Sequence, residues 1–264
     1  MNRIADIKAF YRILAALEAK LGGKRMLSES TGRMNWPYRG VYFFFEPGET
    51  RSDSGEGPKV VRVGTHATTA GAKSRLWGRL SQHRGSARTG GGNHRGSIMR
   101  LLVGVALKKR GSMDHIATWG IGQNSTKACA KLGVTSSKLR ELEYVLESAV
   151  SQYIRSMPFL WVDIDDAPDP KSDRGLIERN SIGLLSNYVQ TPIDRPSDNW
   201  LGAHCDRERV QRSGLWNNNH VDEGYDPEFL GVLERYVART EPSSLMPAAD
   251  ASPRSGLTLS DLQK

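Results

Sequence analysis

The chain has 264 residues, of which 38% are hydrophobic and 25% charged, and this composition excludes a protein that is disordered over most of its length. Its two cysteines, Cys129 and Cys205, lie far apart, which excludes a disulfide framework and a zinc knuckle, so we expect two buried free thiols in a cytoplasmic protein. The first residues lack the apolar core of a signal peptide, and no apolar run is long enough to cross a membrane.

Positive charge is concentrated in one segment. The formal net charge is +8, and residues 57–113 contain 12 Lys and Arg residues but no Asp or Glu, so the rest of the chain sums to −4. A polyanion is the simplest partner for such a segment, because each neutralised phosphate releases condensed counterions. A solvated basic face that keeps the protein soluble is the alternative. Arg62, Arg79 and His83, which are candidate site residues, fall within the same segment, so the polyanion is favoured.

The first part of the chain predicts a helix, a hairpin and a second helix. Apolar residues recur every three or four positions from Ile7 to Leu21, which indicates an amphipathic helix. Two strands, 40–45 and 59–63, are joined by one polar loop and form an antiparallel hairpin most economically. Residues 73–84 follow as a helix whose apolar side chains can face the sheet.

The middle of the chain is less regular. Residues 85–96 form a glycine- and arginine-rich loop that we expect to be mobile when unbound. The apolar run 98–107 is compatible with a helix or a strand by periodicity alone. The apolar spacing over 137–155 predicts a long helix.

The last part predicts a third strand at 159–164, a helix at 175–188 and a final helix at about 227–239. From residue 241 the chain is rich in Pro, Ser, Ala and polar residues, which predicts a disordered tail.

Three short motifs follow one another in an informative order. Gly40-Val41-Tyr42 lies on the first hairpin strand and Arg62-Val63-Gly64 ends the second. Arg79 and His83 then stand four residues apart on the next helix, so their side chains project from one face. This order suggests a site that cleaves phosphodiester bonds.

These motifs resemble the GIY-YIG nuclease superfamily, and most closely its restriction-endonuclease branch, over roughly residues 37–188. The resemblance implies an α+β fold with a small three-stranded antiparallel sheet flanked by helices. It implies hydrolysis of a DNA phosphodiester with one Mg²⁺ or Mn²⁺ ion per site. We therefore expect a core at 36–190, helical extensions at 1–35 and 191–240, and a tail at 241–264.

The resemblance also assigns roles. Tyr42 would act as the general base or its relay, with neighbouring positive charge favouring its phenolate form. Arg79 would contact the scissile phosphate, and His83 would hydrogen-bond the tyrosine or the phosphate. Glu178 would bind the metal ion, and Asn187 would support that end of the site by hydrogen bonding.

Two points depart from the family pattern or stay open. Arg62 stands where the family has its second tyrosine, and it could supply a second phosphate contact. Glu178 is preferred as the metal ligand over Glu141, Glu143 and Glu147 because its spacing to Asn187 resembles the family's ending. Further contacts with the DNA backbone are expected from six residues: Lys73, Arg75, Arg84, Arg88, His94 and Arg95.

Each residue also has a structural interpretation. Tyr42 on a Phe-rich strand could be a core residue, and His83 could cap the C-terminus of its helix, where a positive charge is favourable. Glu178 could form a surface ion pair, and Asn187 could cap a helix. The family order inside an acid-free segment favours the functional interpretation.

We therefore expect a cytoplasmic, metal-dependent endonuclease of the restriction or defence kind that acts on double-stranded DNA, with a homodimer implied by the family. A catalytically silent nucleic-acid-binding protein with the same fold is the alternative, and a basic scaffold protein is a third.

Overall fold

The computed structural model describes residues 2–113 and 115–241. Four strands form one antiparallel sheet in the order β1-β4-β2-β3, where β1 is Arg25–Met26, β2 is Gly40–Thr50, β3 is Pro58–Gly64 and β4 is Pro158–Asp163. The expected α+β class is confirmed, but the expected count of three strands is wrong. The additional strand β1 pairs with β4 through Arg25 and Phe159. It has two residues, which is too short to produce a periodic pattern in the sequence.

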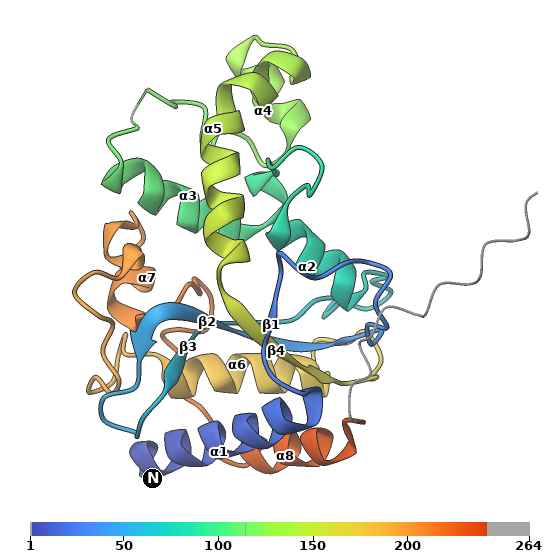
Figure 1. Ribbon diagram of the computed structural model, residues 1–264, viewed down its shortest axis with the longest axis vertical. Helices are drawn as coiled ribbons and strands as arrows, with labels where there is room; N and C mark the ends of the chain where they lie inside the picture. Colours follow the sequence, from blue (N-terminus) through green and yellow to red (C-terminus); the bar gives the residue numbers. More distant parts are fainter. Residues whose placement is uncertain (1, 114, 242–264) are drawn as a thin grey trace, which may run out of the picture.

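Helices cover both faces of the sheet (Figure 1). On one face α1 (Arg3–Leu21), α6 (Asp173–Leu185) and α8 (Phe229–Arg239) pack against one another and the strands. On the other face lie α2 (Leu76–Arg84), α3 (Ile98–Arg110) and α5 (Ser136–Arg155). The remaining helices are α4 (Ser125–Leu132) and α7 (Glu208–Ser213), with short 3-10 turns at η1 (His94–Gly96) and η2 (Leu201–His204).

The alternation of β2 decides which side chains reach which face. Phe43 packs edge-to-face on Phe10 of α1, with 5.7 Å between ring centroids. Tyr42 and Phe44 point to the opposite face, where both rings contact His83 of α2. The hairpin thus delivers Tyr42 to the helix that follows it.

The hairpin strand β2 continues beyond the expected end at residue 45. The sequence predicts a loop from Glu46 to Pro58, yet β2 extends to Thr50, with a register irregularity after Phe45. Glu46 is buried and accepts hydrogen bonds from the indole N–H groups of Trp200 and Trp216. Because these partners lie more than 150 residues away along the chain, no local pattern shows that a polar residue belongs to the strand.

Most expected helices are present, with shifted ends. The N-terminal helix, the long helix α5 and the final helix α8 are confirmed, and the ambiguous apolar run is helix α3. The helix expected from Lys73 begins at Leu76, and the helix expected to reach Tyr188 ends at Leu185. Helix α4 is an addition to the expected elements.

The proposed division of the chain at residues 36 and 190 stays a prediction, although β1 and α1 both pack on the sheet. Of the tail, residues 242–264 lie outside the described residues. Both cysteines are free among the described residues; Cys205 is buried as expected, whereas Cys129 is only half-buried. Within residues 2–113 and 115–241, no helix is long and apolar enough to cross a membrane.

Candidate functional site

A hydrogen-bonded chain of three side chains lies between the hairpin and α2. Tyr42 Oη is 2.8 Å from Nε2 of His83, and His83 Nδ1 is 2.8 Å from Oγ of Ser97, the N-cap residue of α3. Tyr42 and His83 are both fully buried. Because His83 contacts Ser97 on one side and Tyr42 on the other, its ring orientation is fixed.

The glycines of the two strand motifs are required by close approaches. Tyr42 lies opposite Gly64, and a Cβ atom at position 64 would stand 2.3 Å from Tyr42 Oη. A Cβ atom at Gly40 would stand 2.3 Å from the carbonyl oxygen of Val162 on β4. Real Cβ atoms do not approach other atoms so closely, so both positions exclude any side chain in this arrangement.

Two arginines place positive charge beside the buried pair. Arg62, which is buried on β3, donates to the carbonyl oxygen of Trp216 at 2.7 Å. Arg79 is partly exposed and donates to Gln82 Oε1 and to the carbonyl oxygen of Gly96, both at 3.0 Å. Burial first, and then the charges of Arg79 and Arg62, hold the pKa of His83 well below its ordinary value. His83 is therefore neutral near pH 7.

Glu178 reaches the same place from the other helical layer. It lies on α6, and its Oε1 accepts a hydrogen bond of 3.1 Å from the backbone N–H of Thr65, the residue after Gly64. Burial raises the pKa of Glu178, and the nearby charge of Arg62 opposes this shift, with smaller contributions from other groups that include Arg79. Tyr42 packs on Gly64 and Glu178 contacts the next residue, so the end of the hairpin at Gly64 is the candidate centre. The charges of Arg62 and Arg79 act on both His83 and Glu178.

The residues present fit a divalent metal ion at Glu178. Only Oε1 of this carboxylate has a hydrogen-bond partner among the described residues, which leaves Oε2 for a cation. Mg²⁺ is commonly held by one or two carboxylates together with waters and substrate phosphate oxygens. A partly buried carboxyl whose pKa is raised is also a group that a cation would stabilise in its charged form.

Asn187 lies apart from this centre. It follows the end of α6, about two helical turns beyond Glu178. Its side-chain oxygen accepts from Arg3 and from the backbone N–H of Ile193, so its contacts anchor a loop to α1. The structure does not bring it to the other five residues in any hydrogen bond of the described chain.

Asn217, which the sequence did not single out for a role, lies closer to the centre. Its side chain makes two hydrogen bonds to the backbone of Val63, at 3.1 Å to the N–H and 2.9 Å to the carbonyl oxygen. These are the two backbone hydrogen bonds that a neighbouring strand would make at the free edge of β3. Its position beside Trp216 in an Asn-rich, aromatic segment was the only signal in the sequence.

Of the six residues expected to contact DNA, four have side chains that reach the surface and two are committed to internal partners. Lys73, Arg75 and Arg88 are exposed. Arg84 is half-buried, with its guanidinium over Trp77 and a donor bond to the carbonyl oxygen of Ser30.

His94 and Arg95 are committed to internal partners instead. Arg95 forms a two-pronged ion pair with Glu143, with both N–O distances 2.7 Å. His94 is buried, stacks on Trp119 and contacts Glu147 Oε1 through both its ring and its backbone N–H. Neither side chain presents a free donor to a phosphate, so we interpret both as structural.

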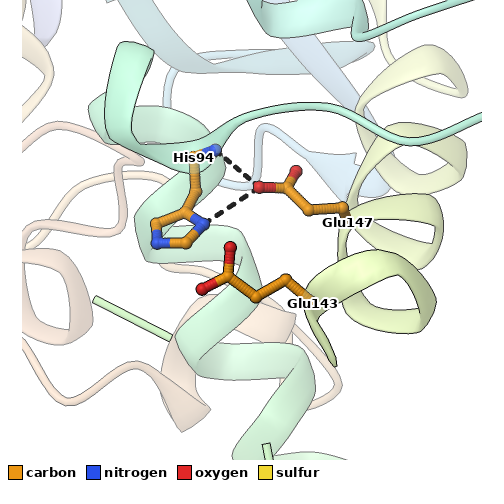
Figure 2. Close-up of side chains that lie close together, drawn as sticks. All are labelled: His94, Glu143 and Glu147. Carbon is orange, nitrogen blue, oxygen red and sulfur yellow. Dashed lines mark hydrogen bonds and ion pairs between the residues drawn. The ribbon is translucent and has the colours of Figure 1, made fainter. Parts of the chain in front are cut away.

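His94, Glu143 and Glu147 form the one His and acidic cluster of the described residues with metal-like spacing, within 4.8 Å (Figure 2). Both glutamates project from α5 toward the histidine. Their carboxylates are already paired with the guanidinium groups of Arg95 and Arg100, and His94 Nε2 accepts from the N–H of Gly120. Because two arginines neutralise the two carboxylates, this cluster does not fit a cation, and its role is to hold α5 in place.

Comparison with known proteins agrees with this geometry. The family model described as the GIY-YIG domain matches residues 1–243. No curated protein and no solved structure matches the chain. The family match spans most of the chain and includes both strand motifs, the Arg–His helix and Glu178, so the protein belongs to the GIY-YIG family of nuclease domains.

Proposed function

We propose that the protein is a DNA endonuclease that depends on Mg²⁺ or Mn²⁺ and serves in restriction or defence. One observation carries the proposal: Tyr42 is hydrogen-bonded to His83 and packs on Gly64, and Glu178 accepts from the N–H of the next residue, Thr65, at the end of the β2–β3 hairpin. The expected family chemistry needs these groups together, because a base, a phosphate-binding cation and a metal-binding carboxylate must act on one phosphate.

The hydrogen-bond chain supports Tyr42 as a proton acceptor. Ser97 Oγ accepts from the backbone N–H of Arg100, and among the described residues the only acceptor within reach of its own hydrogen is His83 Nδ1. His83 then carries its proton on Nε2 and donates it to Tyr42 Oη. This hydrogen bond orients Tyr42 Oη, which is the proposed general base for the attacking water.

The arginines and Glu178 act on the phosphate side of the site. Arg79 is the partly exposed arginine, and it neutralises charge on the scissile phosphate as that charge grows. Arg62 Nε is buried without a hydrogen-bond partner within the described chain, as expected for a group waiting for an anion. Glu178 would hold the metal ion, which when bound acts as a Lewis acid on a phosphate oxygen.

Duplex DNA is the proposed substrate, approached through the exposed side chains of Lys73, Arg75 and Arg88. A cytoplasmic location and a homodimer that cuts both strands belong to the same proposal.

Plasmid cleavage tests the proposal. The wild-type protein should nick supercoiled DNA with Mg²⁺ or Mn²⁺, and chelation with EDTA should stop it. Arg79→Ala and Glu178→Gln should each lower the rate by about 100-fold or more. Glu234→Gln, on an exposed carboxylate of α8, is the matched control and should cut normally. A wild-type protein that binds DNA but never nicks it would refute the enzymatic proposal.

A second candidate is a nucleic-acid-binding protein that has lost the reaction. Full burial of Tyr42 and His83, together with Arg62 in place of a tyrosine, favours it. Salt-sensitive DNA binding without any nicking would select this candidate.

A further inference from the structure

Helices α4 and α5 form a compact pair that the motifs of the family do not include. Leu132 ends α4 and Ser136 begins α5, so three residues form the turn. Gly133 adopts a left-handed backbone with φ of +67°, and the side chain of Thr135 caps α5 by accepting from Lys138 N–H. A three- or four-residue turn that contains glycine is the connection found between the two helices of helix-turn-helix units.

The pair has a small core of its own. Ala128 of α4 and Leu139 of α5 are buried but lie outside the main core that surrounds the sheet. A Cβ atom at Gly122 would stand 2.6 Å from the backbone nitrogen of Ala128, so the preceding chain also packs tightly on α4. Figure 1 shows α4 beside the end of α5 that points away from the sheet.

One face of the first turns of α5 is free. Leu139, Glu143 and Leu146 point inward, whereas Ser137 and Arg140 are exposed on other faces of the helix. Leu142 and Val145 are also exposed, with 41% and 64% of their surface accessible. An α-helix with exposed polar and apolar side chains at its N-terminal end has the groups that read base edges and thymine methyls in the major groove.

The charge of the pair suits a polyanion. Residues 123–142 carry four basic side chains and one acidic one. Lys127 and Lys131 are exposed on α4, and Lys138 and Arg140 are exposed at the start of α5. Lys138 pairs with Glu141 at 2.8 Å, whereas Lys131 and Arg140 form no ion pair with any described residue.

The helix pair is attached rigidly to the candidate active site. Arg100 is fully buried, pairs with Glu147 of α5 and donates to the backbone carbonyl of His83 at 2.9 Å. Tyr144 of α5 donates to the carbonyl oxygen of Thr89 in the loop that follows α2. The cluster of Figure 2 therefore fixes α5 relative to the helix that carries Arg79 and His83.

We propose that α4 and α5 are a helix-turn-helix unit that reads B-form duplex DNA, with the N-terminal part of α5 in the major groove of the duplex that is cut. This inference rests on the proposed function, and adds to it an element for sequence preference. Lys127 and Lys131 of α4 contact the phosphate backbone, and Lys138 and Arg140 of α5 lie at the groove.

The test uses binding to a pool of random-sequence duplexes in the Glu178→Gln background, where cutting should be slowed by about 100-fold or more. The double variant Lys138→Ala/Arg140→Ala should bind about tenfold more weakly or worse, and selection from the pool should lose its preferred sequences. The matched control is Lys8→Ala/Arg12→Ala, which removes two exposed charges from α1 on the opposite face of the sheet. It should keep the affinity and the sequence preference of its parent.

The outcomes separate this inference from the proposed function. If the parent binds DNA and the Lys138→Ala/Arg140→Ala variant binds with the same affinity and the same preferred sequences, the helix-turn-helix inference is overturned and the nuclease proposal stands. If the Glu178→Gln parent does not bind duplex DNA at all, both are overturned. Because the substituted side chains are exposed, both double variants should keep the melting temperature of the parent.

Discussion

Gly64 provides a sharp test of the buried pair. In Gly64→Ala the new Cβ atom would lie 2.3 Å from Tyr42 Oη and 2.4 Å from Cζ, so the tyrosine ring must move. Overpacking of a tight core costs about 1–3 kcal/mol, and loss of the Tyr42–His83 hydrogen bond costs about 1 kcal/mol more. The free energy of unfolding should therefore fall by about 2–4 kcal/mol. At about 2–4 °C for each kcal/mol, the melting temperature should fall by roughly 4–16 °C.

The assay is thermal unfolding followed by circular dichroism, with plasmid nicking measured on the same samples. Gly78→Ala is the control, because Gly78 lies in α2 and a Cβ atom there would make no contact within 4 Å outside its own helix. Alanine is the better helix former by up to about 1 kcal/mol, so this variant should be slightly stabilised and should cut normally. A Gly64→Ala protein that melts and cuts like the wild type would refute the placement of Tyr42 against Gly64.

Three further predictions concern buried ionisable groups. Glu147→Ala leaves the buried guanidinium of Arg100 unpaired and should lower the free energy of unfolding, measured by urea titration, by about 3–5 kcal/mol. The control Glu141→Ala removes an exposed carboxylate and should change this free energy by less than about 1 kcal/mol. Equal effects of the two substitutions would contradict the role of the Arg100–Glu147 ion pair in holding α5. Burial raises the pKa of Glu178 above its ordinary value of 4.5, so between 4.5 and the folded-state pKa the folded protein keeps a proton that the unfolded chain releases, and stability falls as pH rises through this interval. Mg²⁺ should raise the melting temperature of the wild type but not of Glu178→Gln. An equal rise in both proteins would place the ion elsewhere. Burial lowers the pKa of His66 from 6.5 to about 4, so the unfolded chain binds the extra proton and stability falls as pH drops from 6.5 toward 4; His66→Gln should flatten this part of the pH–stability curve, and an unchanged curve would contradict the burial of the ring.

The parts of the fold that the sequence predicts have local causes. The hairpin follows from β-branched and aromatic runs, and its pairing places Tyr42 opposite Gly64. The spacing of Arg79 and His83 on one helix is likewise local, and so is the periodicity of α5. The choice of Glu178 depends on its spacing to Asn187, and the structure brings only Glu178 to the end of the hairpin.

The parts that the sequence does not predict depend on distant partners. Residues 57–113 contain no acid, yet Glu143 and Glu147 of α5 neutralise Arg95 and Arg100 in space. A charge pattern along the chain cannot show this pairing across about 50 residues. Helix α4 is not predicted for a different reason: it has a single buried residue, Ala128, so it produces almost no apolar period.

The measurement that tests the central claim most directly is the Mg²⁺-dependent nicking rate of Tyr42→Phe relative to the wild type. This substitution removes only the hydroxyl that contacts His83, and it leaves the ring in its place on β2. General-base catalysis contributes roughly 100- to 10,000-fold, so we expect a loss of about that size in a protein that remains folded. A folded Tyr42→Phe protein that nicks plasmid at the wild-type rate would contradict the assignment of Tyr42 to the reaction.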